Sequence, residues 1–164
     1  MLDDLETRIA TVLDGIAEND RTEGGLSNRL WSKQVKEGLC ALGKVLGYGV
    51  SAAGCKDADT GEWLFDLIWG DGDKDHFLEM PLAMECEWST DIDQIFWDFE
   101  KLLIAKASHK LFVFQQGTDI EVEHAVKELT VAVHRFRTRL PEERYLLAGW
   151  SSEQKGFIYH VALG

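Results

Sequence analysis

The sequence has few of the residues that break or cross-link a chain. Its 164 residues include 2 prolines and 3 cysteines. The cysteines, Cys40, Cys55 and Cys86, are odd in number and show no C-x-x-C spacing. Neither a disulfide framework nor a thiolate zinc site is indicated, and no proline-rich linker divides the chain. We therefore expect one globular domain over residues 1–164, with reduced thiols.

Long hydrophobic runs are also missing. No stretch approaches the roughly 18 uninterrupted apolar residues of a membrane span. The chain begins Met1-Leu2-Asp3-Asp4, which is acidic where a signal peptide would be basic. From these two absences we expect no membrane contact and a cytoplasmic location.

Positive charge is scarce, and most of the imbalance lies in the first part of the chain. The net charge is −12, and residues 1–100 carry 8 basic and 22 acidic side chains. Binding of a nucleic acid backbone needs Lys and Arg, so the overall charge argues against an extensive interface of that kind. A basic run at 134–139 either contacts an anion or complements the dipole at a helix C-terminus.

Apolar residues at spacings of three and four predict four helices, over about 3–18, 28–46, 91–108 and from 119 to before Pro141. Shorter runs rich in aromatic and branched residues predict six strands. They cover 48–53, 62–69, 78–88, 111–115, 145–150 and 156–162. The order α-α-β-β-β-α-β-α-β-β predicts an α/β fold with a mixed central sheet flanked by helices.

The first three strands are expected to form a consecutive antiparallel meander. The strand at 111–115 should join it through the 91–108 helix as a right-handed crossover. Strand 78–88 alternates, with Leu78, Met80 and Leu82 on one face, and Ala83 and Glu85 on the other. Such a two-faced strand requires cover from at least one helix.

Three acidic residues interrupt strands that otherwise appear buried, namely Asp66, Glu85 and Glu87. If the two strands are neighbours, Asp66 can meet Glu85 and Glu87 across them. Burial of unpaired carboxylates is costly, so a hard divalent cation or a cationic side chain should accompany them. The alternative is that the Glu85/Glu87 face is solvated and that Asp66 pairs with a lysine.

These residues and this order of elements resemble the restriction-endonuclease-like, or PD-(D/E)XK, nuclease superfamily. Its α-β-β-β-α-β core is similar to residues 28–116, with an added N-terminal helix and a C-terminal α-β-β extension. In that family an Asp on the second core strand and a (D/E)-x-K motif on the third surround a divalent metal. Asp66 matches the first and Glu85 the second, whereas Glu87 stands where the lysine should be.

The resemblance implies further roles in this site. Some members move the lysine to the following helix, where Lys101 could take its part, although an Asp98–Lys101 pair at i,i+3 is a structural competitor. Glu37 matches an acidic position on the preceding helix of many members. Asp66 and Glu85 would hold Mg²⁺ or Mn²⁺, and Glu87 or Lys101 would act on the attacking water.

Three interpretations remain open at this point. The chain is a metal-dependent nuclease, or a non-catalytic protein of the same fold with a binding, immunity or regulatory role, or a chain whose carboxylates are structural. The partner would be nucleic acid in the first case and nucleic acid or a protein in the second. Convergence of Glu37, Asp66, Glu85, Glu87 and Lys101 in one cleft would favour catalysis.

Overall fold

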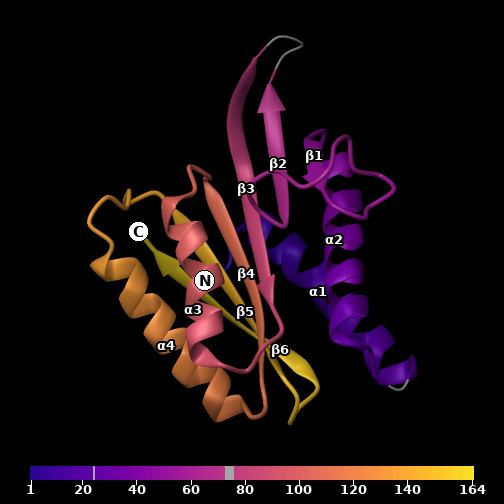
Figure 1. Cartoon of the computed structure of the whole chain (residues 1–164), viewed down its shortest axis with the longest axis vertical. Coiled ribbons are helices and arrows are strands. Elements are labelled where there is room, and N and C mark those ends of the chain that lie inside the picture. Colours follow the sequence, from indigo (N-terminus) through magenta and orange to yellow (C-terminus); the bar gives the residue numbers. More distant parts are fainter. Residues whose placement is uncertain (24, 73–75) are drawn as a thin grey trace.

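A mixed sheet forms the centre of the computed structural model, which describes residues 1–23, 25–72 and 76–164. The sheet has six strands in the order β1-β2-β3-β4-β5-β6 (Figure 1). The strands are β1 (Gly49–Ala52), β2 (Leu67–Gly72), β3 (Phe77–Glu87), β4 (His109–Gln116), β5 (Arg144–Ser151) and β6 (Gly156–Leu163). β1, β2 and β3 form an antiparallel meander, β3, β4 and β5 are parallel, and β6 is antiparallel to β5. The predicted meander and the parallel return after the third strand are both confirmed.

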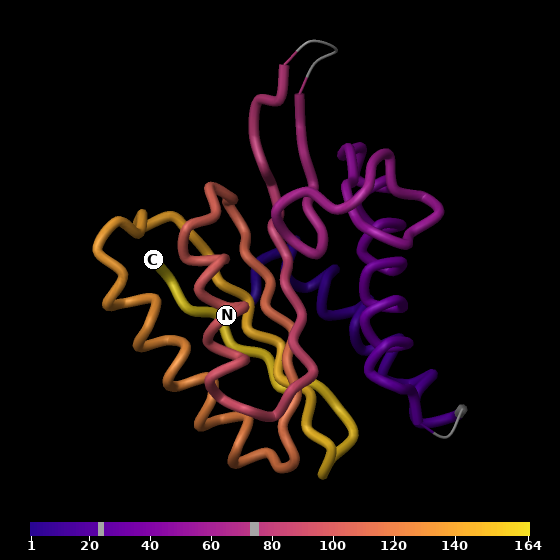
Figure 2. Tube along the Cα trace, viewed as in Figure 1, coloured from indigo at the N-terminus to yellow at the C-terminus, as the bar shows by residue number. Residues whose placement is uncertain are grey.

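Helices cover both faces of this sheet (Figures 1 and 2). α1 (Asp4–Glu23) and α2 (Asn28–Val45) pack on one face, while α3 (Ile92–Ile104) and α4 (Asp119–Arg135) pack on the other. Each face has its own buried apolar cluster, with Leu82 and Met84 of β3 in the first and Ala83 in the second. The predicted α/β class, a mixed sheet between helices, is therefore confirmed.

Polar caps fix where the helices begin. The Ser27 hydroxyl accepts the Leu30 N–H at the start of α2, and the Asp91 carboxylate accepts the Asp93 N–H at the start of α3. α1 runs to Glu23 rather than ending near residue 18, and α3 ends at Ile104, short of residue 108. None of the helices in the described ranges combines the length and the apolar character needed to cross a membrane.

The predicted strand at 62–69 is wrong in its first half, because β2 begins only at Leu67. The Phe65 N–H donates to the Trp63 carbonyl oxygen at 2.8 Å, which closes a tight turn around Leu64. Leu64 has a φ of 65°, a left-handed conformation that cannot continue a strand. Asp66 therefore lies directly before β2 rather than inside it.

The predicted alternation along the third strand also breaks, at Pro81. Trp69 pairs with Leu82 but Asp71 pairs with Glu79, so β3 holds one more residue than β2 across this step. A proline has no N–H for the ladder, which suits it to such a bulge. As a result Met80 packs in the cluster under α3, opposite to Leu82.

β2 and β3 extend together beyond the rest of the sheet (Figure 1). The stretch between the predicted strands 62–69 and 78–88 includes residues 73–75, and the stretch between the predicted helices 3–18 and 28–46 includes residue 24. These four positions lie outside the described residues.

Candidate metal site

Asp66 and Glu85 lie beside each other where β2 begins and β3 approaches its end. Leu67 pairs with Met84, Asp66 directly precedes Leu67, and Glu85 directly follows Met84, so the two carboxylates are neighbours. The Asp66 Oδ2 atom accepts the backbone N–H of Cys86 at 2.9 Å, which holds the carboxylate against β3. Glu85 is 3% exposed, on the face that α3 covers. The alternative of a solvated Glu85 face is therefore wrong.

Lys101 reaches this site from the third turn of α3. Its Nζ atom lies 3.0 Å from Glu85 Oε2 and 2.8 Å from Asp98 Oδ1. The lysine side chain is 40% exposed, so its ammonium lies at the border between the buried carboxylate and solvent. The proposed reach to Glu85 and the competing i,i+3 pair with Asp98 thus exist together.

Glu87 belongs to the same cluster, although it is less buried than Glu85. Its Oε1 atom accepts the Ser89 N–H at 2.6 Å, and its carboxylate lies near that of Asp98. Asp98 therefore connects Glu87 to Lys101. Sequence reasoning treated Asp98 only as a competitor for the lysine, and its i,i+3 spacing from Lys101 was the signal available.

Burial and negative charge dominate the electrostatics here. Burial, with smaller contributions from the Asp66 and Asp98 charges, raises the pKa of Glu85 to about 7 against the opposing effect of Lys101. Burial and the neighbouring Asp98 also raise the pKa of Glu87. Burial opposes the charged form of Lys101, but its bonds to Asp98 and Glu85 raise its pKa.

The cluster therefore brings the Glu85 and Asp98 carboxylates to the Lys101 ammonium, with Asp66 near Glu85 and Glu87 near Asp98. Oxygen ligands and an excess of negative charge are what a divalent cation such as Mg²⁺ requires. Burial, the largest cause, and neighbouring carboxylates raise the pKa values of Glu85 and Glu87, and for Glu85 they do so in spite of the contact with Lys101. The residues present thus fit a divalent cation chemically.

Glu37, the remaining predicted member, has a different environment. It lies 3.7 Å from Lys33 on the exposed side of α2. It also lines a small cavity with Cys40, Cys55, Lys56 and Asp57. The structure therefore gives Glu37 partners of its own on α2 and in the loop after β1.

A second group of possible ligands occurs where the N-terminus meets β4. Asp3, Glu6 and His109 bring three ligand atoms within 4.8 Å of one another, and within the described ranges only this group does so. The carboxylates around Asp66 are therefore more widely spaced. Arg144 lies 3.0 Å from Asp3 and 2.7 Å from Glu6, so a guanidinium already neutralises that group. Its members are far apart in sequence, which hid it from sequence analysis.

No family model, curated protein or solved structure significantly matches this chain.

Proposed function

We propose that this protein is a metal-dependent phosphodiesterase acting on nucleic acid, a variant of the PD-(D/E)XK nucleases with a helix-borne lysine. The observation that supports it most is the 3.0 Å contact between Lys101 of α3 and Glu85 of β3. The contact brings an ammonium to the place where Glu87 has replaced the motif lysine. Asp66, directly before β2, accepts the backbone N–H of Cys86, the residue that follows Glu85.

In this proposal Asp66 and Glu85, with Glu87 nearby, hold Mg²⁺ or Mn²⁺. When bound, the ion supplies a Lewis acid for the phosphoryl oxygen and a bound water of lowered pKa. Lys101 keeps its proton and donates hydrogen bonds to the negatively charged phosphoryl oxygens. Glu87, whose raised pKa makes it a stronger base than an ordinary Glu, orients the attacking water and accepts its proton. Asp98 positions Lys101 through the 2.8 Å contact.

The test is a cleavage assay with single-stranded and duplex DNA and RNA, in Mg²⁺, in Mn²⁺ and in EDTA. We expect cleavage only with metal, and a loss of roughly 100-fold or more in Lys101→Ala, because an electrostatic donor to the transition state is removed. Calorimetry should show nearly unchanged metal affinity in that variant. Lys106→Ala, an exposed lysine just after α3, is the matched control and should keep full activity.

Asp66→Ala distinguishes the role of the metal from that of Lys101. This variant should lose both metal binding and cleavage, whereas Lys101→Ala should lose only cleavage. Wild-type protein that leaves all four substrates intact in both metals would overturn the catalytic proposal. In that case the same fold would serve as a non-catalytic binding, immunity or regulatory module.

A further inference from the structure

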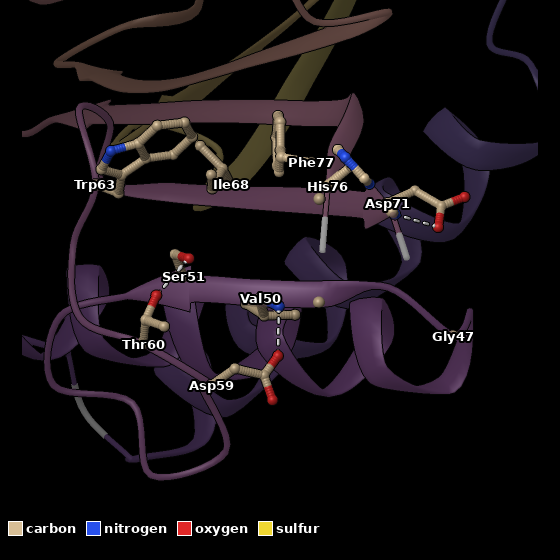
Figure 3. Close-up of a pocket in the computed structure, with 13 residues that line it drawn as sticks. Gly47, Val50, Ser51, Asp59, Thr60, Trp63, Ile68, Asp71, His76 and Phe77 are labelled. Carbon is tan, nitrogen blue, oxygen red and sulfur yellow. Dashed lines mark hydrogen bonds between the residues drawn. The ribbon is translucent and has the colours of Figure 1, made fainter. Parts of the chain in front are cut away.

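A groove of about 600 Å³ lies over β1 and β2, close to the candidate metal site (Figure 3). It includes Ile68, whose side chain belongs to the apolar cluster of the α3 and α4 face. α3 packs on β3 and β4, and therefore the β1–β2 end of this face stays accessible. The groove is a feature of the same sheet face as Glu85.

Two aromatic side chains form one wall of this groove. Trp63 and Phe77 meet edge to face with ring centroids 5.5 Å apart, and they are 47% and 55% exposed. Gly70 allows this arrangement, because a Cβ atom there would lie 2.6 Å from the Phe77 ring. Figure 3 shows Trp63, Ile68 and Phe77 following one another along the strands. Exposed rings held in this way provide a surface on which a flat aromatic ligand stacks.

The rest of the described lining consists of Val50, glycines, His76 and hydroxyl or carboxylate side chains, and among these described residues there is no Lys or Arg. The Thr60 hydroxyl donates to the Ser51 hydroxyl at 2.6 Å. The Asp59 carboxylate accepts the Val50 N–H at 2.8 Å and also pairs with Lys44, which lies outside the lining. Asp71 adds a second carboxylate to the lining. A phosphate meets the Asp71 carboxylate and no Lys or Arg among the described lining residues, whereas a neutral ring with hydrogen-bonding edges is complementary in charge and in shape.

The groove is also close to the carboxylates. Trp63 precedes Asp66 by one turn, and Ile68 follows Asp66 at the start of β2. A strand rises by roughly 3.3 Å per residue, so about 7 Å separates positions 66 and 68. If a nucleobase occupied the groove, the sugar-phosphate backbone of the same nucleic-acid strand would therefore lie beside Asp66 and Glu85.

We propose that this groove binds an unpaired nucleobase of single-stranded nucleic acid. The identity of the polymer rests on the proposed function, but binding itself needs neither metal nor cleavage. In a duplex the faces of the bases are stacked on one another, and so only an unstacked base can present a face to Trp63 or Phe77. The site thus selects single strands through base stacking and excludes their phosphates by charge.

The experiment measures binding in EDTA by fluorescence anisotropy, with a labelled single-stranded DNA oligonucleotide, its duplex, and an abasic strand of equal length. We expect the single strand to bind at least about tenfold more tightly than the other two, as stacking of a base typically contributes 1–3 kcal/mol. Its affinity should not fall as KCl rises from about 0.05 to 0.2 M, because no phosphate contacts release counterions.

Variants assign the effect to the groove. Trp63→Ala and Phe77→Ala should each weaken single-strand binding by about tenfold or more, and Trp63→Phe should retain most of it. Trp97→Ala is the matched control, since Trp97 is an exposed tryptophan on α3 that does not line the groove. Circular dichroism of each variant checks that the fold is kept.

Three outcomes would overturn the inference. They are equal affinity for the duplex or the abasic strand, no binding at about millimolar oligonucleotide, and unchanged affinity in both alanine variants. Self-association that Trp63→Ala abolishes in sedimentation would assign the groove to a second copy and would also refute it. Single-strand binding without cleavage in any metal would refute only the proposed function. Cleavage by a protein that does not bind the single strand more tightly than the duplex or the abasic strand would refute only this inference.

Discussion

The environment of Glu85 both favours and opposes its negative charge. Its side chain is buried on the α3 face of β3, with the Lys101 ammonium 3.0 Å away. A lone lysine at the edge of solvent does not compensate for burial and for the nearby Asp66 and Asp98. The carboxyl group therefore has a pKa of about 7, which makes its charge sensitive to pH in the neutral range.

Glu85→Gln should remove a pH dependence of folding stability. The folded pKa of about 7 lies above the unfolded value of 4.5. The stability from this shift is fully present below pH 4.5 and is lost as pH rises through 7. In metal-free buffer, the free energy of unfolding of the wild type should fall by on the order of 2–3 kcal/mol between about pH 5 and pH 8 because of this group. Urea denaturation at the two pH values measures it.

The matched control for that measurement is Glu79→Gln, an exposed glutamate on the same strand. It should keep the pH dependence of the wild type, whereas Glu85→Gln should flatten it. If the two variants lose stability in parallel from low to high pH, the inferred pKa of Glu85 is wrong.

Residue contacts divide into those the sequence could predict and those it could not. The two-residue period of a strand was enough to place Glu85 next to Asp66 once their strands were taken as neighbours. The reach of Lys101 could not be deduced, because a flanking position on a helix allows either contact or solvation. Lys110 was missed altogether: it is fully buried, 2.9 Å from Glu143 Oε2, and its partner comes from a distant segment.

The segment before β2 determines where the site's first carboxylate lies. Leu64 takes a φ of 65° in the tight turn that ends just ahead of Asp66. A leucine pays a steric cost of order 1 kcal/mol in this left-handed conformation, and its exposed side chain recovers little by packing. Local sequence shows an apolar run from Trp63 to Trp69 that only Asp66 interrupts, which is why the turn was predicted as strand.

Leu64→Gly should stabilise the protein by roughly 0.5–1 kcal/mol, because glycine has no Cβ atom to oppose a positive φ. Leu64→Ala keeps the Cβ atom and should give no such gain. Urea or thermal unfolding of the two variants separates relief of backbone strain from loss of the leucine side chain. Equal stability changes in both variants would contradict the strained turn.

Among the elements, order and type were predictable, and local irregularities were not. Periodicity gave all ten elements in sequence because each packs one apolar face, as in α3 with Ile95, Phe99 and Leu102. The bulge at Pro81 depends on how β3 meets β2, which no window along one strand contains. The cluster that receives Met80 was consequently misassigned.

At the scale of the whole molecule, the charge distribution and the fold meet at the candidate site. The acidic first part of the chain, residues 1–100, supplies the meander and most of α3, and with them the carboxylates of Asp66, Glu85, Glu87 and Asp98. A net charge of −12 raises the cost of a further unpaired carboxylate. A cation bound at this cluster would therefore stabilise the folded state as well as equip it for chemistry.

Millimolar Mg²⁺ or Mn²⁺ should raise the melting temperature of the wild type. A ligand that binds only the folded state adds about 2.7 kcal/mol when its concentration is 100 times its Kd. Any salt also screens repulsion in a chain of charge −12, so KCl of equal ionic strength must accompany each metal sample. The rise in melting temperature with metal beyond the rise with KCl is the part that is due to binding at the site.

This additional rise in melting temperature should vanish in Asp66→Asn. The substitution removes a proposed ligand and keeps the size of the side chain. It should persist in Asp71→Asn, an exposed acid on β2 whose loss changes the net charge equally. Because Glu85 must lose its proton to bind a cation, the shift should also be larger at about pH 8 than at pH 6. A wild-type melting temperature that responds to metal no more than to KCl would show that Asp66 and Glu85 hold no divalent ion.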